Sequence, residues 1–257
     1  MDDELRSTKR FSACVEDYAR YRPSYPVEVV RTLEREARVA PDRTRVVDLG
    51  CGTGISTACF LREGYTVTGV EPNADMRAAA EAALGGSPRF RIVAGRAEDV
   101  PLPDSCCELI VVAQAFHWFD APAARSEMRR LLVDDGVLAL VWNERRIDAS
   151  AFLRDYDAIL RRYATDYAKV TQTYKSDIDI AAFFGPAGCT RRVFPYHQDF
   201  DLAALKGRAM SSSYVPRPGQ PGHDGLVRAL TEAFERHAVA NAVRFEYDTR
   251  LYFGRLS

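Results

Sequence analysis

The segment over residues 48–54, DLGCGTG, has the residue types and spacing of a loop that binds a ligand through its backbone. A short β-branched apolar run precedes it at residues 45–49, and a helical pattern follows it at residues 55–62. Glycines let the chain bend sharply and let a ligand approach without a Cβ in the way. Ligands of doubly wound sheets bind at the carboxyl ends of the strands, at this kind of junction. The sequence therefore predicts a ligand site at this loop.

The spacing of the glycines separates two classes of nucleotide-binding loop. A dinucleotide loop follows the pattern G-x-G-x-x-G, which would need glycine or alanine at the position of Ile55. Here the glycines recur at every second residue, as Gly50, Gly52 and Gly54, and Asp48 precedes them. This spacing argues against a dehydrogenase. The alternative is a tight turn that binds no ligand. Such a turn would need only one glycine, whereas this loop has three.

Glu71 ends the second predicted strand and is the next candidate for ligand binding. An acid at that position can accept hydrogen bonds from both hydroxyls of a ribose. The alternative is a solvated carboxylate at a strand end. The nearby glycine loop favours the first interpretation.

Alternating strands and helices must position these residues. The predicted strands are 45–49, 65–70, 90–94, 108–113 and 137–142; the predicted helices are 27–38, 55–62, 74–84 and 120–132, and a turn follows at 134–136. Strands that are apolar throughout and separated by helices indicate a parallel sheet that is covered on both faces.

The remaining residues do not continue this alternation. We predict a helix at 152–163, a strand at 189–200, a loop at 211–225, a helix at 226–238 and a half-buried antiparallel strand at 245–253. The segment 163–174 fits no element, and its tyrosines Tyr163, Tyr167 and Tyr174 could line a pocket or form one face of a core helix. The fold class is α/β, a doubly wound, Rossmann-like, mostly parallel seven-stranded sheet with an antiparallel C-terminal strand and helices on both faces.

Composition narrows the class of partner. The 35 Lys and Arg residues nearly balance 36 Asp and Glu, so the chain has no overall basic field for a phosphate backbone. The six cysteines form no paired CxxC pattern, and we expect them to be reduced and no metal to be bound. No apolar run approaches the ~20 residues that span a bilayer, and we expect no signal sequence at the acidic N-terminus. We therefore expect a cytoplasmic protein with no membrane partner.

Five motifs together resemble class I S-adenosylmethionine-dependent methyltransferases. They are DLGCGTG at 48–54, GVEPN at 69–73, GRAE at 95–98 followed by Pro101, AQAFHWF at 113–119, and YxxYRPxYP at 18–26. Within this class the chain is similar to the trans-aconitate and ubiquinone/menaquinone-type small-molecule methyltransferases. The resemblance covers residues 10–142; it is specific for the cofactor and not for the acceptor.

The resemblance implies that S-adenosylmethionine is the cofactor and S-adenosylhomocysteine the product, with no metal. It implies that Glu71 binds the ribose and that Gln114 lies beside the sulfonium methyl. The residues implied to contact the cofactor are Asp48, Gly50, Cys51, Gly52, Gly54, Glu71, Pro72, Asn73, Met76, Ala97, Glu98 and Gln114.

Methyl transfer from a sulfonium is an in-line displacement, so holding the acceptor near the methyl supplies much of the rate. A carboxylate acceptor needs no general base, whereas a hydroxyl or a carbon must lose a proton. His117 is the candidate base, because its usual pKa lies near neutral, although it could simply shape the pocket. Gln114 is the second candidate catalytic residue. We expect O- or C-methylation of a small-molecule acceptor.

The N-terminal segment resembles a lid. We expect residues 1–40 to form this helical segment, and the residues implied to contact substrate there and after the fourth strand are Tyr18, Tyr21, Arg22 and Trp118. The alternative is a purely structural role, in which these residues form a helix face that packs on the core. We expect residues 41–257 to form the methyltransferase domain, with a substrate-pocket insertion within 150–225.

Two other functions stay open at this point, apart from the dehydrogenase that the glycine spacing argues against. An RNA or tRNA methyltransferase would need one basic face that gathers Arg191, Arg192, Lys206, Arg208 and Arg217. The near-neutral charge and the lack of an N-P-P-[YF] segment after the fourth strand argue against it. A binding protein without turnover would keep the same cofactor loop. A homodimer is compatible with the sequence.

Overall fold

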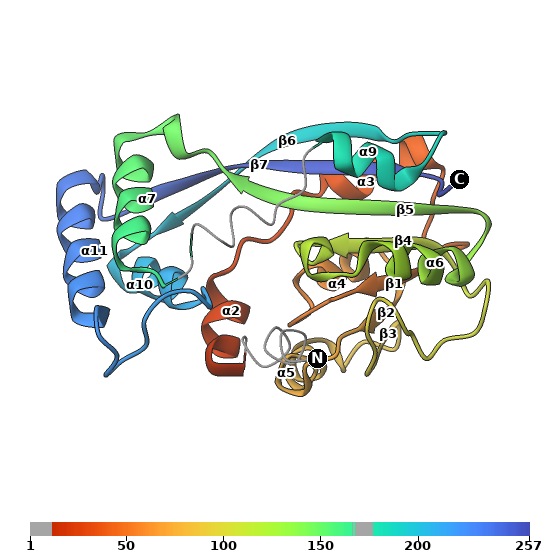
Figure 1. Ribbon diagram of the computed structural model, residues 1–257, viewed down its shortest axis with the longest axis horizontal. Coiled ribbons are helices and arrows are strands. Elements are labelled where there is room, and N and C mark those ends of the chain that lie inside the picture. The colour runs from red at the N-terminus through yellow and green to blue at the C-terminus, as the bar shows by residue number, and fades with distance from the viewer. Residues whose placement is uncertain (1–11, 166, 168–176) are drawn as a thin grey trace.

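The computed structural model describes residues 12–165, 167 and 177–257. Its strands are β1 (Arg45–Leu49), β2 (Thr66–Val70), β3 (Phe90–Val93), β4 (Cys107–Ala113), β5 (Leu132–Arg145), β6 (Thr190–Phe200) and β7 (Val243–Gly254). They form one sheet in the order β3-β2-β1-β4-β5-β7-β6 (Figure 1). Strand β7 runs antiparallel to both of its neighbours, β5 and β6, and the other neighbouring pairs are parallel. The predicted fold class is confirmed.

Helices surround this sheet. They are α2 (Val15–Tyr21), α3 (Glu28–Ala37), α4 (Ile55–Arg62), α5 (Ala74–Leu84), α6 (Ala121–Leu131), α7 (Ala151–Tyr163), α9 (Asp177–Phe184), α10 (Leu202–Met210) and α11 (His223–His237), with short 3-10 turns η1 (Ser12–Cys14), η2 (Phe116–Trp118) and η3 (Ile147–Ala149). Side-chain caps explain where several begin, because a cap oxygen satisfies a backbone N–H that the helix leaves unpaired. Asn73 accepts from the N–H of Met76 at 2.9 Å, and Asp120 from that of Ala123 at 3.2 Å.

Adjacent strand residues enter different cores on the two faces of the sheet. Val46 packs in one cluster with residues of α3 and α4, and its neighbour Val47 in another with residues of α6 and α9. Leu109 and Ile110 of β4 divide in the same way. Side chains alternate across a strand, so an apolar strand can bury both faces. This doubly covered sheet is the rigid base of the site.

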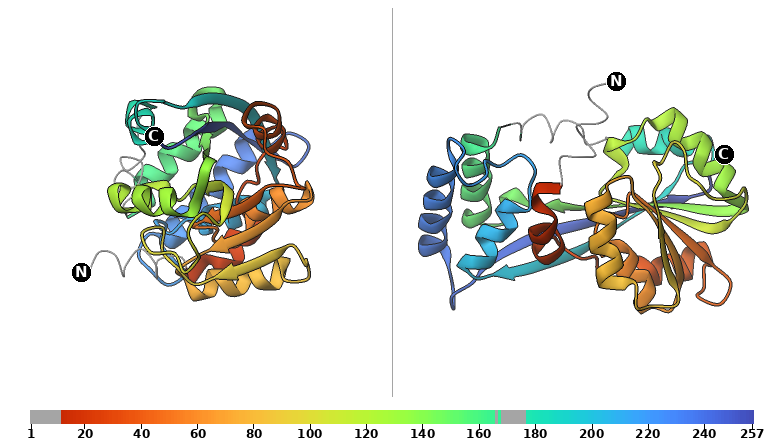
Figure 2. Two further views of the ribbon diagram at one scale, coloured as in Figure 1. Left: turned by 90° about the vertical axis from the view of Figure 1, so that its right-hand side faces the viewer. Right: turned by 90° about the horizontal axis from the view of Figure 1, so that it is seen from below.

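The three strands at one edge of the sheet extend past the parallel part and carry a second lobe. Figures 1 and 2 show β5, β6 and β7 reaching toward α7, α10 and α11, with α2 between these helices and the parallel part. These helices and the outer ends of the strands share a core of their own, in which Phe245 and Tyr156 are fully buried. The molecule therefore has two packed regions that one sheet joins.

The structure corrects three details of the predicted elements. The turn predicted at 134–136 lies within β5, where a register shift between Cys107 and Leu109 of β4 accommodates the extra residues. Helices α9 and α10 were not predicted. Both are short and rich in apolar residues and small residues, which carry a weak helical period. Most of the segment 163–174 lies outside the described residues.

No helix in the described part of the chain combines the length and the apolar character needed to cross a membrane.

The core of the second lobe makes a stability prediction. Phe245 has no exposed surface and its ring meets those of Phe152, Tyr156 and Phe200 at centroid distances of 5.4, 4.8 and 5.1 Å. We expect Phe245→Ala to lower the free energy of unfolding by about 3–5 kcal/mol, measured by urea denaturation. The control is Val193→Ala on β6, where the side chain is exposed and the change should stay within about 0.5 kcal/mol. Equal effects in both variants would contradict this account of the lobe.

Candidate functional site

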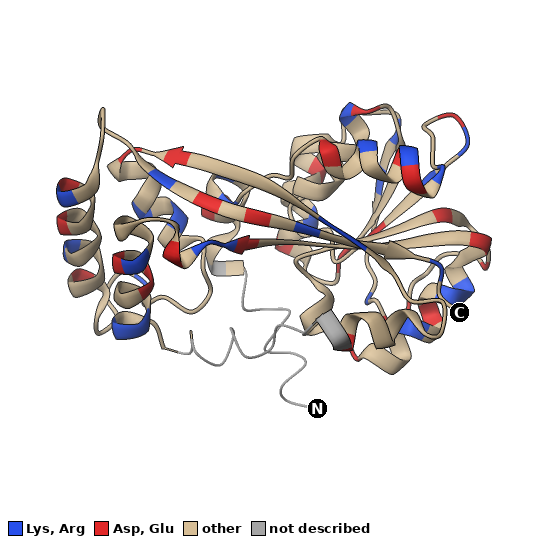
Figure 3. Ribbon diagram, turned by 90° about the horizontal axis from the view of Figure 1, so that it is seen from above, with Lys and Arg blue, Asp and Glu red and all other residues tan. Residues whose placement is uncertain are grey.

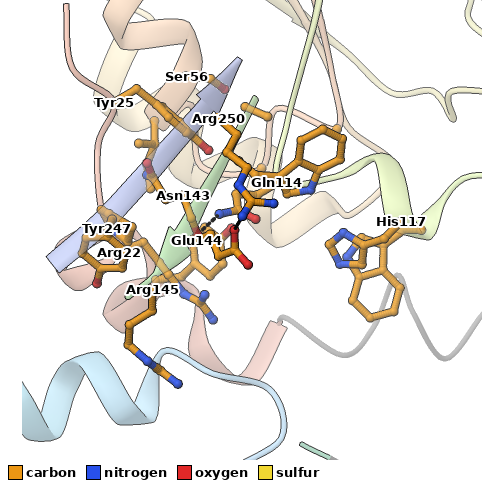
Figure 4. Close-up of a pocket in the computed structure, with 18 of the residues that line it drawn as sticks. Arg22, Tyr25, Ser56, Gln114, His117, Asn143, Glu144, Arg145, Tyr247 and Arg250 are labelled. Atoms are coloured by element: carbon orange, nitrogen blue, oxygen red, sulfur yellow. Dashed lines mark hydrogen bonds and ion pairs between the residues drawn. The ribbon is translucent and has the colours of Figure 1, made fainter. Parts of the chain in front are cut away.

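A cavity of about 420 Å³ opens at the carboxyl ends of β1, β4 and β5, and also contacts the second lobe. The glycine loop, the segment after β4, the end of β5, α2 with the residues after it, and the loop after α10 all contribute to its wall. Figure 4 shows Gln114 and Asn143 between Tyr25 and Ser56 on one side and His117 on another. A cavity of this size suits a small ligand.

The loop between β1 and α4 requires glycine for two separate reasons. Gly50 and Gly54 have φ values of 70° and 86°, in the left-handed region that side chains disfavour. A Cβ on Gly50 would lie 2.7 Å from Cβ of Ala115, and one on Gly54 would lie 2.5 Å from Cδ1 of Leu84. Gly50, Cys51 and Gly52 line the cavity. The backbone of this loop is therefore what a ligand would meet.

Asp48 lies beneath the loop and is fully buried. Its Oδ2 accepts hydrogen bonds from Ser56 Oγ and Thr57 Oγ1, both at 2.7 Å, and ties β1 to the first turn of α4. Burial raises the pKa of Asp48 to about 6, although the bonds from Thr57 and Ser56 oppose the shift. Asp48 does not line the cavity, so its contacts are those of a residue that orients the loop.

The Glu71 carboxylate joins the first two strand ends. Its Oε2 accepts from the Gly52 N–H at 3.0 Å and its Oε1 accepts from the Asn73 N–H at 2.8 Å. Burial raises the pKa of Glu71, and the two backbone hydrogen bonds oppose that shift. A carboxylate held next to the glycine loop in this way has oxygens of the type that accept bonds from ribose hydroxyls.

The other residues implied to flank an adenine make structural contacts in this structure. Asn73 caps α5, Met76 is 3% exposed and Ala97 is 5% exposed. Glu98 accepts from the Asp120 N–H at 2.9 Å. None of these four, nor Gly54, Glu71 or Pro72, lines the described cavity. Their cofactor contacts therefore stay predictions.

Gln114 has a strained backbone where β4 ends. Its φ is 56°, which is uncommon for a residue with a side chain and is a feature of functional sites. Its N–H donates to the carbonyl of Val141, and its Nε2 donates to that of Asn143, both at 2.9 Å. These bonds hold the side chain in the cavity, against β5.

His117 and Trp118 follow in η2 and also line the cavity. Burial lowers the pKa of His117 to about 4, so its ring is neutral at pH 7. A base with so low a pKa accepts a proton weakly, because efficient catalysis favours a pKa near the working pH. The role of His117 as a base stays a prediction, and the buried ring equally suits one that shapes the pocket.

The N-terminal segment divides between cavity and core. Tyr18 and Arg22 line the cavity, and the Arg22 guanidinium lies 4.8 Å from the Tyr18 ring centroid. Tyr21 was expected beside them but does not line the cavity. Its ring lies against Gly207 of α10, where an added Cβ would be 2.1 Å away. Successive residues at the end of α2 point in different directions, which separates Tyr21 from the site.

The second lobe supplies functional candidates that the sequence did not reveal. The cavity is also lined by Asn143, Glu144, Arg145, Arg161, Tyr167, Arg208, Ser213, Tyr214, Tyr247, Arg250 and Tyr252. Tyr167 lines the cavity and also packs in the core of the second lobe, so it fits both alternatives, whereas Tyr174 lies outside the described residues. The signal was weak, because isolated arginines and tyrosines in irregular segments resemble a solvated surface until the fold brings them together.

The described residues contain no group of three or more His, Cys, Asp or Glu side chains that could hold a metal ion.

Part of the chain matches known proteins. Residues 47–140 match a family described as a methyltransferase domain. An uncharacterized methyltransferase of Mycobacterium tuberculosis is 40% identical over 135 residues, 52% of each chain. An uncharacterized methyltransferase-like protein of Schizosaccharomyces pombe is 32% identical over 160 residues, 62% of this chain and 60% of that protein. The chain spans about half the length of the first of these curated relatives.

Solved structures extend the likeness beyond the matched domain. The structure of a candidate type II methyltransferase from Anaeromyxobacter dehalogenans is 23% identical, with a TM-score of 0.63 over 92% of this chain and 98% of that one. A Haemonchus contortus phosphoethanolamine N-methyltransferase, in complex with S-adenosylhomocysteine, is 15% identical with a TM-score of 0.56 over 98% of this chain and 58% of that one. At these identities the likeness concerns the fold.

The family that residues 47–140 match is a methyltransferase domain, and the fold of the whole chain resembles that of solved methyltransferase structures. The match covers residues 47–140, and the strands and helices after these residues complete the seven-stranded sheet.

The buried Asp48 makes a prediction about stability against pH. Its folded pKa of about 6 lies above the ordinary 3.8, so the unfolded chain releases this proton first as the pH rises. Stability from this group is complete below pH ~4 and is lost as the pH rises through ~6. We expect the free energy of unfolding of the wild type, minus that of Asp48→Asn, to fall by roughly 3 kcal/mol across this window.

Urea denaturation at pH values from about 4 to 7 measures this difference, and the variant serves as the control for all other titrating groups. A difference that stays constant across the window would show that Asp48 is ionised normally.

Proposed function

We propose that this chain transfers a methyl group from S-adenosylmethionine to a small-molecule acceptor, with an oxygen or a carbon as the favoured accepting atom. The observation that carries the proposal is the glycine loop, with its Gly52 N–H bonded to Glu71, at the edge of a cavity that continues to Gln114. The loop backbone and an acid at the second strand end suit the ribose and methionine parts of the cofactor.

The residues present fit the cofactor chemically. Gly52 lines the cavity, and no atom lies within 4 Å of the position that a Cβ on it would take, so the loop leaves open space for a ligand there. The buried Asp48 ties the strand before this loop to the helix after it. Glu71 offers carboxylate oxygens for ribose hydroxyls, in exchange for one of its present backbone bonds. Bound S-adenosylmethionine would supply an activated methyl on a sulfonium, so the protein need not supply a nucleophile of its own.

The contribution of the chain would be to position the acceptor and to exclude water. Gln114 is fixed by bonds to Val141 and Asn143 and presents its amide to the cavity. Trp118 and Trp142 offer apolar wall to a planar acceptor. Since orientation alone can supply much of the acceleration, this arrangement suffices for an acceptor that needs no base.

The domain boundaries belong to the same proposal. Residues 12–40 contribute Tyr18 and Arg22 to the wall of the cavity, in keeping with the proposed lid segment within 1–40. Residues 150–225 include α7 and α10, which contribute Arg161 and Arg208 to its wall, in keeping with a substrate-pocket insertion.

The distribution of charge favours a small acceptor over RNA. Figure 3 shows acidic and basic residues interspersed along the helices and the long strands. Of the residues that a basic face would need, Arg192 pairs with Glu36 at 2.7 Å, and Arg208 is 5% exposed and lines the cavity. A continuous basic surface that binds a phosphate backbone would need Arg192 and Arg208 to be exposed and free of acidic partners. Their positions therefore argue against RNA as the acceptor.

Glu71 tests the cofactor site. We expect Glu71→Gln to weaken binding of S-adenosylhomocysteine, measured by calorimetry, by about 1.5–3 kcal/mol, because an amide replaces charge-assisted hydrogen bonds to the ribose. Asp199→Asn is the matched control, because Asp199 pairs with Arg244 in an exposed ion pair on β6 and should leave the affinity unchanged. A well-folded wild type that fails to bind S-adenosylhomocysteine would rule the proposal out.

A further inference from the structure

Among the five arginines that line the cavity are three from separate parts of the chain, Arg22, Arg145 and Arg208. Arg22 follows α2, Arg145 ends β5 and Arg208 lies in α10. Arg208 is 5% exposed, and the side chain of Arg145 is 12% exposed. Figure 4 draws Arg22 and Arg145 near Tyr247 and away from His117. Burying a guanidinium is costly unless a charge and hydrogen bonds compensate it.

The hydrogen bonds within the protein leave these guanidiniums partly unsatisfied. In the described part of the chain, the Nε atoms of Arg22, Arg145 and Arg208 are all buried and have no acceptor. Arg208 Nη1 donates to Ser211 Oγ at 3.3 Å, and Arg22 Nη2 donates to the carbonyl of Ser211 at 2.9 Å. Ser211 thus connects Arg22 and Arg208, which contribute to the same region of the wall.

The acids near the cavity are already used by other arginines or are shared. Glu144 forms an ion pair with Arg250. Asp157 accepts from Arg161 at 2.6 Å and lies 3.5 Å from Arg145.

Neither Arg22 nor Arg208 has an acidic partner among the described residues. The cavity wall therefore carries positive charge that the protein itself does not neutralise.

The pKa of Tyr214 responds to the same three positive charges. Burial by itself would raise the pKa of this phenol, but Arg22, Arg145 and Arg208 together lower it below its ordinary value. All three positive charges therefore act on one point in the cavity wall.

We propose that Arg145 and Arg208, with Arg22, form an anion subsite that binds a carboxylate or phosphate group of the methyl acceptor. This inference rests on the proposed function and adds the chemical class of the acceptor. Guanidinium groups bind such oxyanions through paired, charge-assisted hydrogen bonds, and the free Nε–H groups provide the donors.

The cofactor cannot supply this negative charge. S-adenosylmethionine has one carboxylate, but its ammonium and its sulfonium each carry a positive charge, so its binding adds net positive charge to the cavity. Arg22 could meet the cofactor carboxylate and Arg208 would still lack a counter-charge. An acceptor that is an anion would supply the missing counter-charge.

Arg217 provides a control for the alternative that these arginines only stabilise the structure. Arg217 also ties the loop after α10, through bonds to the carbonyls of Met210 and Ser212 at 2.5 and 3.2 Å, but it does not line the cavity. Arg217→Gln therefore removes a guanidinium from the same loop without touching the proposed subsite.

The experiment uses the full chain with and without saturating S-adenosylhomocysteine. Its probes are benzoate and phenyl phosphate, with benzamide as the neutral isostere of benzoate. Binding is followed by intrinsic fluorescence, because the only two tryptophans of the sequence, Trp118 and Trp142, both line the cavity. The variants are Arg208→Gln, Arg145→Gln, Arg208→Lys and the control Arg217→Gln.

We expect saturable binding of at least one anion and none of benzamide up to about 10 mM. The better of the two anions identifies the group as carboxylate or phosphate. Arg208→Gln and Arg145→Gln should each weaken the anion by about tenfold or more, while Arg208→Lys recovers part of the loss. Arg217→Gln, and the affinity of every variant for S-adenosylhomocysteine, should change by less than about twofold.

The inference is wrong if neither anion binds the wild type, if benzamide binds as tightly, or if Arg217→Gln weakens the anion as much as Arg208→Gln. Should Arg208→Gln fail to fold by circular dichroism, Arg145→Gln and Arg208→Lys decide the result. Anion binding that depends on Arg208 in a chain that does not bind S-adenosylhomocysteine would uphold the subsite and reject the proposed function.

Discussion

The site depends on the Glu71 carboxylate, which accepts one backbone N–H from the glycine loop after β1 and another from the start of the segment after β2. These two bonds fix the ends of adjacent parallel strands relative to each other, and the buried Asp48 fixes the loop from below. Both carboxylates have raised pKa values because burial disfavours their charge. Buried carboxylates at two strand ends cost the fold stability, and such costs are typical of binding sites. We therefore expect the ligand to bind at this edge of the sheet.

The same edge of the sheet connects this loop to the second lobe. Strand β5 follows from the core, where Leu138 and Leu140 are fully buried, to Asn143 and Arg145 at the cavity, and its partner β7 supplies Tyr247 and Arg250. One rigid strand pair therefore carries residues beside Gln114 and residues of the anion subsite. The relative position of the two parts of the cavity is set by a β ladder, which is stiffer than a loop.

The sequence predicted the parts whose pattern is local. The strand at Arg45–Leu49 and the helices at Ile55–Arg62 and Ala74–Leu84 were predicted with the bounds that the structure has, because glycines, caps and apolar runs mark their ends. The arginine cluster could not be predicted, since Arg22, Arg145 and Arg208 lie far apart in sequence and meet only through the sheet and α10. Tyr21 does not line the cavity because its ring packs against Gly207 of α10, a contact between distant segments that no local pattern predicts.

The central claim is that the loop of residues 50–54 and Glu71 hold S-adenosylmethionine with its methyl directed into the cavity. A crystal structure of the chain grown with S-adenosylhomocysteine tests it most directly. The account predicts electron density for the nucleoside with its ribose hydroxyls on Glu71 and the sulfur facing the side of the cavity formed by Gln114. Density for the ligand elsewhere, or a glycine loop that remains empty at saturating ligand, would contradict it.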